Sequence, residues 1–414
     1  MNNRSKPALT DFPFKSAIMI AVVLIPVLIF HWYTYGQGLF FTNDSHHYLS
    51  ASQSFKSSSG FVDSDNNYLL FWPPLFPIII STINAPEQLF RYVNMALVVI
   101  IAISVFRITR IVIRSKVLAF LCFIFVLTGV QLLLIASYFW SELIFLTLTL
   151  VFVETLLRYP ANKRLIYVTI FVGFLLCLQR NAGVFIALGA SLWLHFQRRN
   201  TIDKSVEPLA FFLFVVSGSI VWNFYVWILL SHDQFSFSEA LFQNASYNLG
   251  SMSSALVGTF LPIRNFSTPI LIAAFAIFIY ALKSHIAINH AFQLLFMLSI
   301  TYLCFLSLVL VVNIEGYRID FGEGERFVSV IIPLVGIMVF QSMEFYLDRL
   351  KKPAKKVLVV LIVLWLVYPV SRTVKNAKQW HAIPRVSAVK EKIEKLDLLY
   401  LTGQKEKRFR ARPN

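Results

Sequence analysis

The stretch from Phe40 to Pro77 reads FFTNDSHHYLSASQSFKSSSGFVDSDNNYLLFWPPLFP and lies between long apolar runs. It contains Asp44, the first acidic residue after the first apolar run. Apolar or aromatic side chains at Tyr48, Ala51 and Phe55 are spaced as in a helix that lies on a membrane surface. An acid and two histidines here make this loop the first place to look for chemistry.

The composition indicates a membrane protein. Of the 414 residues, 57% are hydrophobic and 14% are charged, and the mean hydropathy is +0.68. Apolar runs near 20 residues have the length that a helix needs to cross a bilayer. The net charge of +16 is explained by loop residues that orient helices and contact anionic lipid, so no nucleic-acid partner is expected. All three cysteines fall inside apolar runs, which gives no support for disulfides or a zinc site.

We therefore predict an all-α, polytopic transmembrane protein with about 11 spans and with outer-face juxtamembrane helices in the first loop. The run at 69–83 is short and contains Pro73 and Pro74, so we expect it to re-enter or to lie beside the membrane. The predicted spans are 16–33, 87–106, 117–137, 141–157, 165–179, 181–196, 207–230, 268–283, 291–312, 327–346 and 356–371.

Loop charges predict the orientation. With the N-terminus in the cytoplasm, 19 basic residues fall in inner segments. Six fall in outer loops, namely Lys56, Arg91, Arg180, Arg264, Arg318 and Arg326. The first run has no clear cleavage site after it, which favours an uncleaved anchor. We expect a multi-pass protein of the bacterial inner (plasma) membrane.

The chain divides into a transmembrane domain and a tail. Residues 1–371 form the predicted transmembrane domain, whose first outer loop, 34–86, carries Asp44. Residues 372–414 form a basic C-terminal tail with a short amphipathic helix at 388–399.

Asp44 is followed closely by His46 and His47. A carboxylate at the outer face can take a proton from an attacking hydroxyl, or bind a divalent cation such as Mg²⁺ or Mn²⁺, with His47 as a second ligand. The same three residues also fit an exposed loop acid beside a solvated histidine pair.

Three further charges lie at the predicted outer ends of spans. Glu142 begins a span, where the helix dipole alone would favour a carboxylate. Arg180 lies between two apolar runs, and Arg91 lies at the start of another. Both arginines are suited to bind a phosphate through paired N–H donors, although a solitary arginine at an interface is more often a snorkelling side chain.

The loop Asn313–Arg326 reads NIEGYRIDFGEGER and is the densest acidic stretch in the chain. It ends with Glu325 and Arg326 immediately before a predicted span. It fits a cation or sugar site, and it also fits a solvated hairpin between two helices.

An ordered set of short motifs resembles the GT-C superfamily of integral-membrane glycosyltransferases, especially the family-39-like bacterial members. The motifs run from Asp44 to Pro333. They are D-S-x-x-Y-L at Asp44, Ser45, Tyr48 and Leu49; P-P-L-x-P at Pro73, Pro74, Leu75 and Pro77; S-E-x-x-F at Ser141, Glu142 and Phe145; R-N-x-G at Arg180, Asn181 and Gly183; and E-R-F with a later proline at Glu325, Arg326, Phe327 and Pro333.

This resemblance implies a transferase that uses a polyprenyl-phosphate sugar on the outer face. Asp44 would match the catalytic acid of the first loop and deprotonate the acceptor hydroxyl, with inversion at the anomeric carbon. Arg180 and Arg326 would bind the lipid phosphate. Ser45 stands where protein O-mannosyltransferases often have Glu, which disfavours that branch and leaves the metal requirement open. The acceptor would be a glycan, a lipid or a protein.

Two other functions handle the same lipids. A polymerase or ligase of surface polysaccharide usually relies on a large outer loop with Arg or His, and the loop 231–267 has only Arg264 and His232. A transporter or flippase would carry ionisable residues near the middle of its spans, and these centres are nearly free of them.

Overall fold

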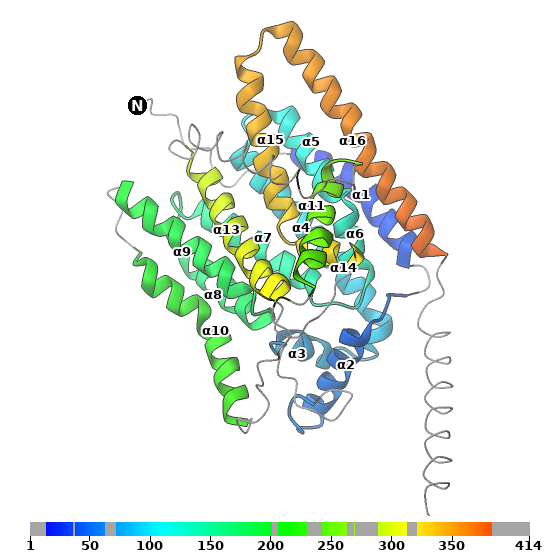
Figure 1. Ribbon diagram of the computed structural model, residues 1–414, viewed down its shortest axis with the longest axis vertical. Coiled ribbons are helices and arrows are strands. Elements are labelled where there is room, and N and C mark those ends of the chain that lie inside the picture. Colours follow the sequence, from blue (N-terminus) through cyan, green and yellow to red (C-terminus); the bar gives the residue numbers. More distant parts are fainter. Residues whose placement is uncertain are drawn as a thin grey trace, which may run out of the picture.

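The computed structural model describes residues 14–35, 38–62, 72–200, 206–229, 244–262, 289–312 and 321–382, with the single positions 242 and 269. Within these ranges every named element is a helix (Figure 1). Phe40 and Tyr138 form an isolated β-type bridge.

The helix α7 (Glu142–Arg158) lies at the centre, packed against α4 (Pro86–Val112) and α8 (Leu165–Gln179). Its sequence is apolar on every side, and most of its side chains are buried. A helix that is apolar all round is placed inside a bundle because no face of it requires solvent.

The end of α7 away from Glu142 is held by an ion-pair group. Glu154 accepts hydrogen bonds from Nη1 of Arg107 at 3.1 Å and from Nη1 of Arg158 at 2.9 Å. Arg107 belongs to α4 and Arg158 to α7 itself, so Glu154 joins the two helices.

Three helices form one flank of the bundle (Figure 1). The helix α9 (Gly183–Asn200) packs along α13 (His290–Ser307), which continues into a π-helical turn, η2 (Leu308–Val312). The helix α10 (Pro208–Leu229) packs against α8 and α9.

The opposite flank contains α1 (Phe14–Tyr35), which packs against α4 and the long α16 (Lys352–His381). The helix α15 (Ile332–Arg349) precedes α16, and the two form a hairpin at the top of Figure 1. The helix α5 (Lys116–Leu127) contacts α4 and α15.

Short helices gather at the other end of the bundle, which we call the site end. The helices α2 (Asn43–Lys56) and α3 (Leu75–Ser81) pack together there (Figure 1). The helix α11 (Ala245–Phe260) packs against α14 (Phe321–Val328). Seven residues span only about 10 Å, so α3 is too short to cross a membrane.

The all-helical prediction is confirmed for the described residues. Six segments there are long and apolar enough to cross a membrane, which makes the chain an integral membrane protein: Ser16–Thr34, Pro86–Val112, Lys116–Ser137, Pro208–Ile228, His290–Leu310 and Lys352–His381. The total of about 11 spans stays a prediction. Other predicted spans fall on helices such as α7 and α8, with 17 and 15 residues, and 268–283 lies outside the described residues except at position 269.

Two predicted spans differ from the structure in detail. The predicted span 117–137 matches the apolar segment Lys116–Ser137, but this segment is two helices, α5 and α6 (Val130–Ser137), because Gly129 has extended backbone angles. The helix predicted to end at residue 371 continues to His381, so the first part of the predicted tail is helical. The predicted amphipathic helix at 388–399 lies outside the described residues.

The close approach of α9 to α13 depends on Gly189. A Cβ at this position would lie 2.6 Å from Oγ1 of Thr301 and 2.8 Å from the main-chain oxygen of Met297. Membrane helices pack closely where small residues remove such side chains. We expect Gly189→Ala to push the two helices apart, lose roughly 1–3 kcal/mol of stability, and lower the melting temperature in detergent.

Gly250→Ala is the matched control for this prediction. A Cβ at Gly250, within α11, would have no atom within 4 Å, so Ala should be neutral or stabilising there. Equal melting temperatures for Gly189→Ala and the wild type would contradict the packing argument.

Candidate active site

The segment before α2 is attached to the link between α6 and α7. The N–H of Phe40 donates to the carbonyl of Ser137 at 2.9 Å, and the N–H of Phe139 donates to the carbonyl of Phe40 at 2.8 Å. Oγ of Ser45 donates to the carbonyl of Phe139 at 2.9 Å. These bonds bring the start of α2 against the start of α7, although some 90 residues separate them in the chain.

The start of α2 is also stabilised locally. Oγ of Ser45 accepts the N–H of Thr42 at 3.1 Å, as in a capping box. Oγ1 of Thr42 accepts from Nε1 of Trp140 at 2.8 Å. Asp44 lies in the first turn, where the helix dipole favours a carboxylate.

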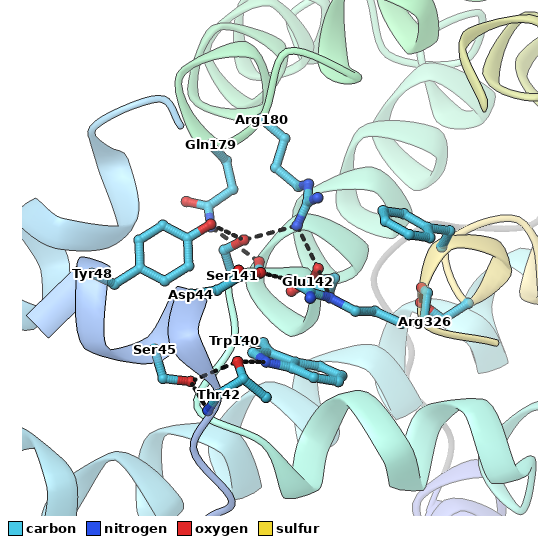
Figure 2. A network of polar contacts seen from close by, with 12 residues as sticks. Thr42, Asp44, Ser45, Tyr48, Trp140, Ser141, Glu142, Gln179, Arg180 and Arg326 are labelled. Atoms are coloured by element: carbon cyan, nitrogen blue, oxygen red, sulfur yellow. Dashed lines mark hydrogen bonds and ion pairs between the residues drawn. The ribbon is translucent and has the colours of Figure 1, made fainter. Parts of the chain in front are cut away.

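Four charged side chains meet at this junction, and we call them the arginine–carboxylate cluster (Figure 2). Oε1 of Glu142 binds Nη1 of Arg180 at 2.6 Å and also binds Nε of Arg326. Nη2 of Arg326 binds Oδ2 of Asp44 at 2.6 Å. Asp44 comes from α2, Glu142 from α7, Arg180 from the link between α8 and α9, and Arg326 from α14.

The four side chains differ in exposure. Glu142 is 3% exposed and Arg326 is 9% exposed, whereas Arg180 is 19% and Asp44 is 27% exposed. The two positive charges balance the two negative charges, which lowers the cost of removing them from water. Asp44 is the member that a ligand from outside can most readily reach.

Neutral side chains complete the surroundings of the cluster. Oγ of Ser141 accepts from Nη1 of Arg180 at 2.9 Å and lies 3.2 Å from the hydroxyl of Tyr48. Nε2 of Gln179 donates to the carbonyl of Ser141 at 3.0 Å. Burial raises the pKa of Tyr48 well above its ordinary value, so its hydroxyl stays neutral and acts as a hydrogen-bonding group.

The aromatic ring of Trp140 covers one side of Arg326. The guanidinium carbon lies 4.1 Å from the ring centroid, within the range of a cation–π contact. Together with the bonds to Glu142 and Asp44, this contact holds the guanidinium of Arg326 in one orientation.

Four of the residues singled out in the sequence, Asp44, Glu142, Arg180 and Arg326, therefore come together. Arg91 does not contact them: its guanidinium lies 5.1 Å from the ring centroid of Trp32 and 4.9 Å from that of Tyr92. This is the geometry of an interfacial arginine packed on aromatic rings.

The remaining candidates face other partners. Glu325 is paired with Arg372 of α16. The ring of His47 stacks on Trp72 at 5.6 Å between centroids, and His46 lies 6.0 Å from Phe41.

Sequence reasoning did not assign roles to several residues around the cluster. Ser141 and Tyr48 belong to the motifs quoted above, and Gln179 adjoins Arg180, so adjacency was the available signal. Trp140 likewise adjoins Ser141. Arg372 had no such signal, because its contacts are made only in the folded chain.

The expected divalent cation stays a prediction. No group of three or more His, Cys, Asp or Glu side chains suited to a metal occurs among the described residues. Oδ2 of Asp44 is bound to Arg326, and the ring of His47 packs on Trp72.

No protein-family model matches the chain, and no curated protein matches it in sequence. Solved structures do match its fold. ArnT from Cupriavidus metallidurans bound to undecaprenyl phosphate aligns with a TM-score of 0.53 and 12% identity over 84% of this chain and 62% of ArnT. The chain has the GT-C fold. The fold predicted from the ordered motifs is thus confirmed.

Two other matches complete the comparison. ArnT in the apo state gives a TM-score of 0.52 and 13% identity over 82% of this chain and 61% of ArnT. The archaeal oligosaccharyltransferase AglB from Archaeoglobus fulgidus was solved in complex with an inhibitory peptide and a dolichol-phosphate. It gives a TM-score of 0.47 and 11% identity over 89% of this chain and 56% of AglB. The chain spans about three fifths of the length of ArnT.

Glu142 is expected to be the member of the cluster most important for stability. Glu142→Gln keeps the shape of the side chain but leaves Arg180 and Arg326 without the carboxylate that both contact. Breaking a buried pair in this way costs about 3–5 kcal/mol, so the melting temperature in detergent should fall clearly.

Asp44→Asn is the comparison for this prediction. Asp44 contacts one arginine and is more exposed, so its loss should lower the melting temperature less. If Glu142→Gln has the same melting temperature as the wild type, Glu142 does not hold the two arginines together.

Proposed function

We propose that this chain is a membrane glycosyltransferase that moves a sugar from a polyprenyl-phosphate donor to an acceptor on the outer face of the membrane. The observation that carries the proposal is the arginine–carboxylate cluster, at one end of a helix bundle with the GT-C fold. A partly exposed carboxylate beside two arginines offers a base for the acceptor and cations for a phosphate leaving group.

Arg180 and Arg326 are proposed to bind the donor phosphate. Each guanidinium has five N–H donors, and the contacts to Asp44, Glu142 and Ser141 use only some of them. Glu142 holds the two like charges near each other before any ligand arrives. Preorganised cations stabilise charge that develops on a leaving group more effectively than mobile ones.

Asp44 is proposed to act as the general base. The acceptor hydroxyl would give its proton to Asp44 while its oxygen bonds to the anomeric carbon of the sugar. The bond between that carbon and the phosphate oxygen would break, and the polyprenyl phosphate would leave with the electron pair. Attack from the side opposite the phosphate inverts the anomeric configuration.

The donor class is supported by the fold. ArnT, which shares the fold, has been solved bound to undecaprenyl phosphate. The proposed side of the membrane is supported by the loop charges, which favour a cytoplasmic N-terminus and an outer site end. The acceptor is proposed as a glycan, lipid or protein.

The first test is Asp44→Asn in an assay of sugar release from a panel of polyprenyl-phosphate sugars, with and without EDTA. Loss of a general base should lower the rate by about a hundredfold or more. Loss of activity with EDTA would support a cation at Asp44 and His47.

Asp348→Asn is the matched control for the activity test, because Asp348 is 61% exposed in α15 and pairs with Lys355 on the following helix. Full activity of Asp44→Asn would remove Asp44 from the proposed chemistry. Donor uptake without sugar release would favour the transporter alternative.

The second test concerns the phosphate. Arg326→Gln and Arg180→Gln should each weaken binding of undecaprenyl phosphate about tenfold or more, because a hydrogen bond to a charged group contributes about 1.5–3 kcal/mol. Native mass spectrometry can measure binding against the non-phosphorylated polyprenol.

Arg110→Gln, at an exposed position of α4, is the control for the loss of one positive charge. If both cluster variants bind as tightly as this control, the phosphate is bound elsewhere.

A further inference from the structure

The helix α16 binds the end of α11 through one face. Trp365, Tyr368 and Arg372 follow each other at intervals of three and four residues, so their side chains project on the same side of α16. Nε1 of Trp365 donates to the carbonyl of Phe260 at 2.7 Å, and the hydroxyl of Tyr368 donates to that of Gly258 at 2.8 Å.

Arg372 contacts two elements at once. Its Nη1 donates to the carbonyl of Gly258 at 2.5 Å, among the last carbonyls of α11, which lack partners within that helix. Its Nη2 is paired with Glu325 of α14. The side chains of Arg372 and Glu325 are 12% and 6% exposed, so this is a largely buried ion pair.

The position of α14 depends on such contacts. A helix of eight residues is too short to be stable alone. Two contacts besides that of Arg372 hold α14 in place. Gly324 packs closely on Ser251 of α11, and the hydroxyl of Tyr302 donates to the carbonyl of Phe327 at 3.0 Å. The residue after Glu325 is Arg326, which reaches Asp44 and Glu142.

We propose that Arg372 is a positioning residue for Arg326. By fixing Glu325 to the end of α11, Arg372 of α16 sets where the guanidinium of the next residue, Arg326, lies. This inference rests on the proposed function, in which Arg326 binds the donor phosphate. Arg372, the first residue of the predicted basic tail, thus shapes the site without contacting the substrate.

The test is a double-mutant cycle on binding of undecaprenyl phosphate to the full chain. Arg372→Gln should weaken binding about tenfold, which corresponds to about 1.4 kcal/mol. In the Arg326→Gln background the same change should cause little further loss, because residues that act through one group are not additive. Arg372→Lys, which keeps the charge, should recover part of the affinity.

Tyr368→Phe is the matched control, because it removes a hydrogen bond to the same carbonyl of Gly258 without touching Glu325. It should keep wild-type affinity. Unchanged affinity of Arg372→Gln, or an equal loss in the Arg326→Gln background, would overturn the inference.

A second cycle separates this inference from the proposed function. If the wild type does not bind undecaprenyl phosphate, the proposed function fails, and melting temperatures still decide the role of Arg372. The fall in melting temperature of the double variant Arg372→Gln, Glu142→Gln should then be smaller than the sum of the falls in the two single variants. Both single variants remove a contact that positions Arg326, so their effects should overlap. Additive shifts would overturn the positioning role.

Discussion

The site end of this protein depends on one carboxylate that binds two arginines. Glu142 stands at the start of the central helix, is almost completely buried, and binds both Arg180 and Arg326 through the same oxygen. Without that negative charge, two guanidinium groups from separate parts of the chain would repel each other in a medium that screens little. Asp44 then binds the outer side of Arg326 and closes the group.

The cluster joins α2 and α14 to the packed helices α7 and α8. The link before α2 reaches it through bonds to the link before α7, and α14 reaches it through Arg326 and through the contact of Glu325 with α16. The central helix α7 and the short helices α2 and α14 therefore make different contributions to the cluster. The bundle provides a fixed carboxylate, and the short helices α2 and α14 bring Asp44 and Arg326 to it.

Much of the fold could be predicted from the sequence, because long apolar runs indicate membrane-spanning helices. Basic residues are few in the predicted outer loops, and Asp44, Glu142, Arg180 and Arg326 stood out because they lie there beside such runs. Their pairing could not be predicted, since Arg326 binds groups 282 and 184 residues away in the chain. Arg91 has a similar local setting and yet packs on Trp32, a difference that only tertiary contacts decide.

The central helix is fastened at both ends. Glu142 binds arginines at one end, and Glu154 binds Arg107 and Arg158 near the other, along a helix of 17 residues that is about 25 Å long. Sliding α7 along its axis would break the pairs of Glu142 with Arg180 and Arg326 together with the pair of Glu154 with Arg107. The cluster is therefore held at a constant level in the helix bundle, so a thicker or thinner bilayer would change its distance from the lipid headgroups.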